Sequence, residues 1–391
     1  MKKILLLSFY YTPDLCAGSF RAAALIDALL PMAKSYNIHI DLITTMPNRY
    51  HHFKAEAGTY EQRENIAIYR IPLPSHKSGF IDQAKAFTTY YLSVKKLLKK
   101  NKAMKYDCVF STSSRLFTAF LGARVSHKYQ CPLFLDMRDI FTETMESLLP
   151  APLKKILVPI FKQVENYTLK RANALNLVSS GFTSYFSQKI KSDCALFHIS
   201  NGVDICFKNL NNKTIAAHFK KPIRILYAGN IGAGQGIEKI IPSLAHNTAD
   251  LCEFRIVGSG GKLNTLKKTC ANITNVKIIP PMSRALLITE YEQADILFLH
   301  LNDCPAFLRV LPSKIFEYVM TGKPILAGVP GCSAKFLSEH VLSCEVFKPC
   351  DADAGLEKLK MIIDNNNTDN KTDTELFYQK FNREKLIILN Q

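Results

Sequence analysis

Short apolar runs alternate with longer segments of helical period along almost the whole chain, and this alternation limits the fold more than any other feature. A first series of runs lies at 3–9, 38–44, 66–71, 107–111, 132–136, 174–179 and 195–199, and a second at 223–228, 252–257, 276–279, 295–299, 324–328 and 344–347. Apolar runs separated by helical segments are typical of parallel sheets with helical crossovers. The sequence therefore predicts an α/β fold.

A polar stretch at 206–222 separates the two series. The chain has 391 residues, which is enough for two or three domains with a core each. We therefore expect two doubly wound, Rossmann-like domains in tandem, at 1–207 and 208–373. A terminal helix within 374–391 is expected to pack back on the first domain.

The chain carries a large positive charge, because 50 Lys and Arg side chains stand against 33 Asp and Glu side chains, a net +17. Residues 1–205 hold 27 basic and 15 acidic side chains, or +12. A surplus of this size points to an anionic partner such as a phosphorylated ligand, a membrane surface or nucleic acid. Nucleic acid is the least favoured of these partners, since no aromatic stacking platform or known binding motif accompanies the basic residues.

Residues 83–106 concentrate this charge, with seven lysines and no carboxylate. The cations that we place on the membrane or acceptor side are four of these lysines, Lys95, Lys96, Lys99 and Lys100, together with Arg21 near the start of the chain. Apolar side chains recur beside them at helical spacing, from Phe87 to Leu98. The segment is either a basic amphipathic helix that docks on anionic lipid or a domain helix whose apolar stripe packs on the sheet.

The cysteines and the apolar runs indicate the cellular compartment in which the protein is expected to function. The 11 cysteines include no Cys-x-x-Cys pair and several lie inside apolar runs, as expected for reduced thiols of a cytosolic protein. The apolar start lacks a small-x-small cleavage site and is expected to form a strand. No run of about 20 apolar residues exists, so we expect no membrane-spanning helix.

Ligands of parallel sheets bind beyond the carboxyl ends of the strands, so the loops after the strands are the place to search. The loop after the first run contains Gly18 before a helix expected to begin at Ser19. The loop at 227–236 has four glycines, and its spacing does not match the dinucleotide fingerprint. Gly258 lies in a third glycine-rich loop. Each loop is either an approach to a phosphate or sugar or a turn that only packs.

The fourth loop is the most specific. Ser313 is a good N-cap, and the helix behind it is expected to run to Thr321 with Gly322 after its end. Free amides at Ser313 and Lys314 would face a diphosphate, and Glu317 lies one turn along, about 5–6 Å away. A carboxylate there can accept from both hydroxyls of a ribose. The alternative is a capped helix with a surface carboxylate.

These residues resemble a known family over nearly the whole chain. The motifs that carry this resemblance are Glu317 followed by Gly322-Lys-Pro324, the loop at Gly229, Asn230 and Gly232, Val257-Gly-Ser-Gly260, Val178-Ser-Ser-Gly181 and Ile199-Ser-Asn-Gly-Val-Asp204. Together they resemble the retaining glycosyltransferases of family four. That family has the two-domain GT-B architecture. Within that family the chain is similar to bacterial enzymes of O-antigen and capsule synthesis, notably the N-acetyl-fucosaminyltransferase group. The segments that show this similarity are Pro312-Ser-Lys-Ile-Phe-Glu-Tyr318, Tyr227–Gly232 and Asp136-Met-Arg-Asp139.

The resemblance implies a function and assigns residues to it. Glu317 would bind the ribose, the helix start at Ser313 and Lys314 would bind the diphosphate, and Gly18 would lie near the phosphates and the acceptor. The enzyme would move a sugar, with an N-acetylated deoxyhexose as one candidate, from a UDP donor on the second domain. The acceptor on the first domain would be a lipid-diphosphate-linked saccharide of lipopolysaccharide or capsule, on the cytoplasmic side of the inner membrane.

The chain departs from the family at three places. Position 309 is Arg where the family has a hexose-binding Glu, and Asn230 and Gln235 replace an Arg and a Lys of the glycine loop. The diphosphate charge would then be met by Arg309, Lys314 or Arg21. The His of many members is Arg138 here, followed by Asp139, and these two residues are the candidates for a catalytic group that otherwise stays open.

No metal or cofactor is expected. Asp351-Ala-Asp353 spells a metal-binding Asp-x-Asp, but it precedes a helical pattern, where N-capping is the better interpretation. Two other functions remain open at this point. One is a UDP-sugar epimerase of the same architecture, and the other is a non-enzymatic protein that binds anionic lipid or nucleic acid.

Overall fold

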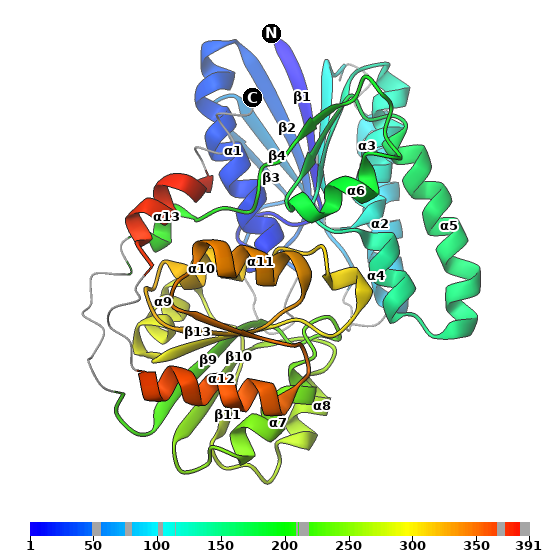
Figure 1. Cartoon of the computed structure of the whole chain (residues 1–391). Coiled ribbons are helices and arrows are strands. Elements are labelled where there is room, and N and C mark those ends of the chain that lie inside the picture. The colour runs from blue at the N-terminus through cyan, green and yellow to red at the C-terminus, as the bar shows by residue number, and fades with distance from the viewer. Residues whose placement is uncertain are drawn as a thin grey trace. The chain divides into compact units, whose positions relative to one another are not determined.

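The chain divides into two compact units, Met1–Ser200 and Asn201–Arg383 (Figure 1). The computed structural model describes residues 1–48, 56–74, 80–100, 105–113, 115–208, 210, 219–365 and 372–383. Each unit is an α/β body built on a largely parallel sheet, which confirms the predicted fold class. The boundary at Ser200 falls before the expected 207, and much of the predicted connector, at 209 and 211–218, lies outside the described residues.

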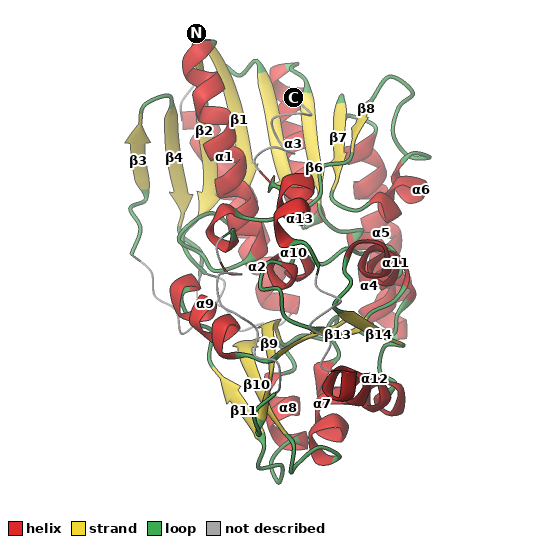
Figure 2. Cartoon of the chain, turned by 60° about the vertical axis from the view of Figure 1, so that its left-hand side comes forward, coloured by secondary structure: helices red, strands yellow, loops and turns green. Residues whose placement is uncertain are grey.

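The first unit is built on an eight-stranded sheet (Figure 2). Its strands are β1 (Lys2–Ser8), β2 (Ile38–Thr45), β3 (Tyr60–Arg63), β4 (Ile66–Ile71), β5 (Cys108–Ser113), β6 (Leu133–Met137), β7 (Ala174–Leu177) and β8 (Ala195–Phe197). The order is β3-β4-β2-β1-β5-β6-β7-β8, and only β3 is antiparallel to its neighbour. Each of the seven predicted runs forms a strand. The sequence misses β3 because its residues, Tyr-Glu-Gln-Arg, form an edge strand without an apolar run.

Helices cover both faces of this sheet. The helix α1 (Ala17–Ser35) lies on one face, while α2 (Phe80–Lys100), α3 (Leu116–Tyr129) and α5 (Ala151–Leu169) lie on the other (Figure 1). The short helices α4 (Phe141–Leu148) and α6 (Thr183–Phe186) complete the unit. Since α1 begins at Ala17, Gly18 and Ser19 belong to its first turn, and Ser19 is not its N-cap.

The helix α2 uses its apolar stripe inside the unit. Tyr90, Val94 and Leu98 are buried, and the Tyr90 hydroxyl donates a hydrogen bond of 2.8 Å to the carbonyl of Ile43 on β2. The domain-helix alternative is therefore the correct one for this stripe. Lys95, Lys96, Lys99 and Lys100 remain exposed on the outer side of α2.

The second unit contains a six-stranded parallel sheet. Its strands are β9 (Ile223–Asn230), β10 (Cys252–Ser259), β11 (Val276–Ile279), β12 (Ile296–His300), β13 (Ile325–Gly328) and β14 (Cys344–Phe347). All six were predicted. The order β11-β10-β9-β12-β13-β14 is the doubly wound order, in which the strand sequence reverses between the first strand and the fourth. This reversal lies between β9 and β12, which is where a ligand site is expected.

Two apolar clusters cover the two faces of this sheet. Along β9, Ile225 and Tyr227 face one cluster, and Leu226 and Ala228 face the other. The first cluster includes side chains of α7 (Ile237–His246), α8 (Leu263–Thr269) and α12 (Ala352–Asn365). The second includes side chains of α9 (Arg284–Gln293), α10 (Lys314–Val319), α11 (Gly331–His340) and α13 (Thr374–Phe381).

The described residues of α13 pack within the second unit, whereas the expected packing of the terminal segment on the first domain stays a prediction. The rings of Phe377 and Phe381 lie 6.2 and 5.8 Å from the ring of Phe316 on α10. Arg383, just after α13, forms an ion pair of 3.0 Å with Asp204. The rest of the predicted terminal segment, 384–391, lies outside the described residues.

Candidate functional site

The glycine loop after β9, residues 230–236, lies at the point where the strand order of the second unit reverses. Gly258, at the end of β10, has a φ of +155°, and a Cβ there would overlap the carbonyl oxygen of Gly229. A Cβ at Gly260 would overlap the carbonyl of Ile231 in the same way. The glycines after β10 therefore let two loops approach closely, so the packing alternative accounts for Gly258.

Two side chains at the end of β12 hold this loop in place. The His300 ring is buried, its Nδ1 lies 2.6 Å from the carbonyl oxygen of Gln235, and its Nε2 accepts from the amide of Cys350. Burial lowers the pKa of His300 to about 4, so the ring is neutral at physiological pH. Asn302 donates from Nδ2 to the carbonyl of Ala233 at 2.9 Å. Both contacts cross the switch point and fix the loop.

The fixed loop presents free amide groups. Among the described residues, the structure shows no hydrogen bond from the N–H groups of Gly232, Ala233 and Gly234. The loop replaces the family's two cations with Asn230 and Gln235, and the Asn230 amide donates to Gln235 Oε1 at 2.8 Å. These two residues therefore hold one another, and successive backbone N–H groups of the kind that bind anions remain.

Glu317 is a buried carboxylate on α10, with 6% of its surface exposed. Its Oε2 accepts from the Tyr291 hydroxyl at 2.9 Å and from Lys314 Nζ at 2.8 Å. The hydroxyl of Tyr318, the next residue, accepts at 3.1 Å from the amide of Ala228 on β9. This contact places α10 beside the end of β9, the strand from which the glycine loop leaves.

The start of α10 differs in part from what the sequence predicts. Ser313 occupies the N-cap position, but its side chain makes no capping hydrogen bond. Lys314 Nζ is engaged by Glu317 and by the Tyr291 hydroxyl, at 2.8 and 2.9 Å. Arg309 is half-buried in the segment before this helix. The helix ends at Val319, two residues earlier than expected, and Gly322 has a φ of +67°.

In the first unit, Gly18 and Arg138 lie together at the carboxyl edge of the sheet. A Cβ at Gly18 would come within 2.9 Å of an Arg138 guanidinium nitrogen, so the absence of a side chain lets the guanidinium lie against the first turn of α1. Arg138 Nε is buried and makes no hydrogen bond within the described part of the chain. This pairing of a helix start and a guanidinium suits an anion.

Asp139 lies beside Arg138, directly after β6. Burial raises the pKa of Asp139 to about 6, against the opposing charges of Arg138 and Arg115. Arg115 lies over the ring of Phe87 at 4.9 Å and donates to the hydroxyl of Tyr10 at 2.7 Å. A carboxyl with a pKa near 6 can both give and take a proton at physiological pH, as an acid–base group must.

The prediction that Arg21 faces the acceptor or the diphosphate is wrong. Arg21 is buried and forms two hydrogen bonds of 2.8 Å with the carboxylate of Asp136. Its other contacts are the carbonyls of Ile199 and Ser200. Asp136 also accepts from Thr112. Four of its five N–H groups are engaged in this way, so the guanidinium fastens α1 to β6 and to the segment after β8.

The Asp-x-Asp triplet caps a helix, as predicted. Asp351 Oδ1 accepts from the amide of Ala354 at 3.0 Å, in the first turn of α12. Within the described ranges, no group of three or more His, Cys, Asp or Glu side chains is arranged to hold a metal ion.

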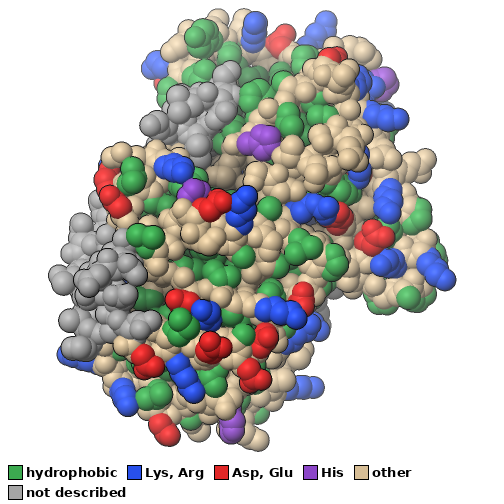
Figure 3. Space-filling view, viewed as in Figure 1, with side chains coloured by type: hydrophobic (Ala, Val, Ile, Leu, Met, Phe, Trp, Pro, Cys, Tyr) green, Lys and Arg blue, Asp and Glu red, His purple; other side chains and the backbone are tan. Residues whose placement is uncertain are grey.

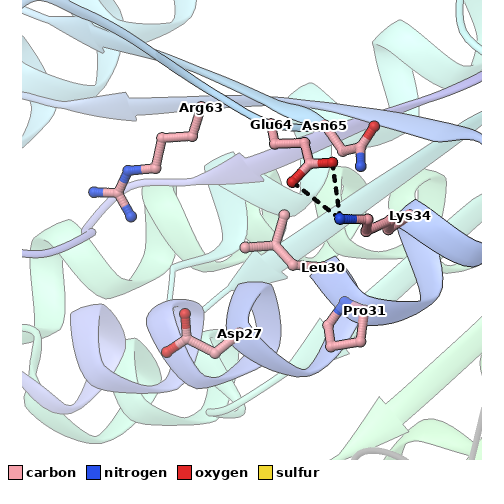
Figure 4. Close-up of a pocket in the computed structure, with 7 residues that line it drawn as sticks. All are labelled: Asp27, Leu30, Pro31, Lys34, Arg63, Glu64 and Asn65. Atoms are coloured by element: carbon pink, nitrogen blue, oxygen red, sulfur yellow. Dashed lines mark hydrogen bonds and ion pairs between the residues drawn. The ribbon is translucent and has the colours of Figure 1, made fainter.

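A cavity of about 400 Å³ lies in the first unit, away from these loops (Figure 4). Its lining residues are Asp27, Leu30, Pro31, Lys34, Arg63, Glu64 and Asn65. It lies between α1 and the turn that precedes β4, so it is at the amino end of that strand. The exposed ion pair of Lys34 and Glu64, 3.1 Å apart, borders it. Ligands of parallel sheets bind at the opposite edge, so this cavity is not part of the candidate site.

Comparison with known proteins decides the class of the second unit. Residues 209–375 match the family model described as glycosyl transferases group 1. These residues form a glycosyltransferase domain. The group 1 match covers the glycine loop, Arg309 and Glu317, so the prediction of a glycosyltransferase is confirmed. No curated protein matches the chain in sequence.

Three solved structures with the same two-domain fold are distant in sequence. Sucrose-phosphate synthase from Thermosynechococcus elongatus has a TM-score of 0.72 at 14% identity, covering 100% of this chain and 97% of that one. HepE of Anabaena, in complex with UDP and glucose, has a TM-score of 0.67 at 16% identity, covering 100% and 98%. WaaG, a glycosyltransferase involved in lipopolysaccharide biosynthesis, has 0.65 at 12%, covering 99% and 98%. These matches confirm the GT-B fold around the group 1 domain.

Sequence reasoning missed several residues that build these sites. His300 directly follows the predicted run at 295–299, and this position is the signal that could have found it. Tyr291 lies in the last turn of α9 and Arg115 directly precedes α3, and neither has a local motif. The sequence does not announce them, because their roles arise from contacts with Glu317 and Tyr10 far along the chain.

Proposed function

We propose that the chain transfers a sugar from a UDP donor to a lipid-diphosphate-linked saccharide, with retention of anomeric configuration. The observation that carries this proposal is the buried Glu317 carboxylate beside a glycine loop with three free amides. A carboxylate suits the hydroxyls of a ribose, and the amides suit the phosphates that follow it. The group 1 match and the UDP in the HepE complex support the choice of donor.

The difficult step is the departure of UDP, because negative charge grows on the diphosphate as the sugar leaves. The amides of Gly232, Ala233 and Gly234 and the cations Arg309 and Lys314 are the groups of this chain proposed to stabilise that charge. The loop that carries the amides is fixed before the reaction, since His300 and Asn302 hold it. Preorganised donors of this kind need no rearrangement as the charge develops.

The acceptor belongs to the first unit in this proposal. Residues 1–205 hold +12 of the net charge, and Arg138 has a buried nitrogen without a hydrogen bond among the described residues. A diphosphate-linked lipid is an anion on a membrane, which suits both features. Among the described residues, none of the helices has the length and apolar character needed to cross a bilayer. We therefore propose peripheral attachment to the cytoplasmic side of the inner membrane.

The polymer and the sugar are proposed on narrower grounds. The motifs at Pro312–Tyr318 and Asp136–Asp139 support O-antigen or capsule synthesis, and an N-acetylated deoxyhexose is the sugar that they favour. WaaG acts in lipopolysaccharide biosynthesis, which is consistent with this assignment. Arg309 occupies the position where the family places its sugar-reading carboxylate, so a donor other than a common hexose is expected.

A screen against nucleotide sugars tests the function directly. We expect a UDP-sugar to raise the melting temperature of the protein and GDP-sugars to do so less. The UDP-sugar that binds is then offered with a lipid-linked acceptor, and transfer with retention is the expected product. EDTA should leave the transfer rate unchanged. The absence of a shift with every UDP- or GDP-sugar would contradict the proposal, and sugar conversion without an acceptor would indicate an epimerase.

Arg309 and Lys314 are expected to share the diphosphate charge. Arg309→Ala and Lys314→Ala should each lower kcat/KM for the donor about tenfold, because each removes one charge-assisted hydrogen bond of roughly 1.5–3 kcal/mol. Steady-state kinetics with varied donor measure the effect. Lys335→Ala, an exposed lysine on α11, is the control and should leave kcat/KM as in the wild type. Wild-type turnover in both Arg309→Ala and Lys314→Ala would remove these cations from the mechanism.

A further inference from the structure

The helix α5 exposes a stripe of large aliphatic side chains. Leu153, Ile156 and Ile160 are 47%, 64% and 49% exposed, and their spacing of i, i+3 and i+7 places them on one side of the helix. The other large apolar side chains that are exposed in the described residues are scattered over separate elements. Single exposed aliphatic residues are ordinary, whereas three on one helical face mark an interaction surface.

The opposite side of α5 is firmly packed, so the exposed stripe is not the result of a loosely attached helix. Val158 and Leu169 are buried. The ring of Phe161 lies 6.1 Å from Phe117 on α3 and 5.3 Å from Phe141 on α4. The helix has an inner face that holds it to the unit and an outer aliphatic stripe that nothing in the described structure covers.

The charges that α5 presents to solvent are positive. Between Ala151 and Val164 the helix contains three lysines, Lys154, Lys155 and Lys162, and no carboxylate. Its carboxylate, Glu165, is fully buried and accepts hydrogen bonds from Thr142, Tyr185 and Lys189. Lys162 lies 3.7 Å from Glu146 on α4, which balances part of this charge. Hydrophobic and basic side chains both reach the surface in the region of α5 (Figure 3).

We propose that the stripe of Leu153, Ile156 and Ile160 docks on an anionic phospholipid surface, with the lysines of α5 on the headgroups. Aliphatic side chains beside lysines on one helix are the pattern of helices that lie in the membrane interface. The helix α2 has the greater number of lysines, but its apolar residues Tyr90, Val94 and Leu98 face the sheet and are buried. It can therefore supply attraction without insertion.

This inference deepens the proposed function and rests on its claim that the acceptor is carried by a lipid. Docking through α5 would hold the first unit at the surface in which a lipid-linked acceptor is anchored. The anchoring and the transfer reaction use different residues, since Leu153, Ile156 and Ile160 are not among the groups to which the proposed reaction gives a role. The two claims can therefore fail separately.

Vesicle co-sedimentation of the full chain tests the surface. The vesicles contain equal parts of phosphatidylglycerol and phosphatidylcholine, with pure phosphatidylcholine as the uncharged comparison. We expect the variant with Leu153→Asn, Ile156→Asn and Ile160→Asn to lose at least about tenfold in partitioning to the anionic vesicles. Lys155→Gln and Lys162→Gln should each cost up to about fivefold, an effect that high salt removes from the wild type as well.

A matched variant of the second unit controls for the loss of exposed apolar residues in general. Leu286, Leu342 and Leu376 are 59%, 68% and 62% exposed, and their joint replacement by Asn should leave vesicle binding unchanged. Thermal melting and the shift produced by the donor verify that each variant is folded and binds nucleotide sugar.

Three results would overturn the assignment of α5. The first is that the stripe variant binds anionic vesicles as well as the wild type does. The second is that the wild type does not bind anionic vesicles. The third is that the wild type forms a dimer and that the stripe variant loses this dimer but keeps vesicle binding. A greater loss from replacing Lys95, Lys96, Lys99 and Lys100 of α2 than from replacing the stripe would also count against it. Loss of vesicle binding with unchanged donor binding supports the proposal. Failure of sugar transfer with intact vesicle binding would contradict the proposed function alone.

Discussion

Replacement of Glu317 by glutamine is expected to lower kcat/KM for the UDP-sugar donor about 100-fold while leaving the protein folded. The carboxylate accepts from Tyr291 and Lys314 through Oε2, at 2.9 and 2.8 Å, which leaves Oε1 to accept from a ligand. Glutamine presents an NH₂ group in place of one oxygen, so either a ribose hydroxyl or the pair of donors loses its acceptor. Hydrogen bonds to a charged group contribute roughly 1.5–3 kcal/mol each, which corresponds to about 10- to 100-fold.

Donor binding by calorimetry and steady-state kinetics measure this effect. The loss should fall mainly on KM and on the dissociation constant for UDP, because the ribose is bound alike before and during the reaction. Tyr291→Phe keeps the carboxylate and should have a smaller effect in the same direction. Glu339→Gln on α11, an exposed glutamate of the same unit, is the control. Unchanged UDP binding by the Glu317→Gln protein would exclude this carboxylate as the ribose ligand.

Glu317 could be predicted from the sequence because its evidence is local. The N-cap position, one helical turn and Gly322 lie within ten residues, and such short-range patterns fix where a side chain stands on a helix. Tyr291 could not be predicted, because it reaches Glu317 from a different helix, 26 residues earlier in the sequence. Its hydroxyl acquires a role only when α9 and α10 pack on the same face of the sheet.

Arg21 shows the same limit from the other side. The sequence correctly identifies a cation near the start of α1, and a cation that follows Gly18 and the loop after the first strand is a reasonable partner for a phosphate. Its actual partner, Asp136, is 115 residues away in the sequence and lies on β6 of the sheet on which α1 packs. Since the sequence does not tell which residues face one another across strands β1, β5 and β6, it cannot distinguish a structural ion pair from a binding residue.

The strands and the helix α2 show which structural features an apolar sequence pattern can predict and which it cannot. Thirteen apolar runs all became strands, because burial on both faces of a parallel sheet demands continuous apolar sequence. The amphipathic pattern of α2 was equally visible, yet a pattern does not say whether protein or lipid covers the apolar side. In the structure, α2 uses its stripe on the sheet, and α5 leaves three aliphatic side chains exposed on one side of the helix.

Asp139→Asn is expected to have opposite effects on activity and on stability. Burial raises the pKa of Asp139 to about 6 from its usual value near 4, so the folded chain holds this proton more tightly than the unfolded chain does. As pH rises through the window from about 4 to about 6, the contribution of Asp139 to the free energy of unfolding therefore declines. Above that window the buried carboxylate costs stability, and asparagine removes this cost.

The variant should therefore gain on the order of 2 kcal/mol in its free energy of unfolding at pH 7.5, with the gain disappearing below about pH 4. Turnover should fall about 1,000-fold if the Asp139 carboxylate accepts a proton from the acceptor as a general base, as its position beside Arg138 indicates. The wild-type rate should rise with pH through an apparent pKa near 6 if the ionised form acts as the base. Chemical denaturation at several pH values and the pH profile of kcat/KM measure the two effects. A destabilisation of the Asp139→Asn protein that is equal at every pH, or turnover within tenfold of the wild type, would show that Asp139 only supports the structure around Arg138.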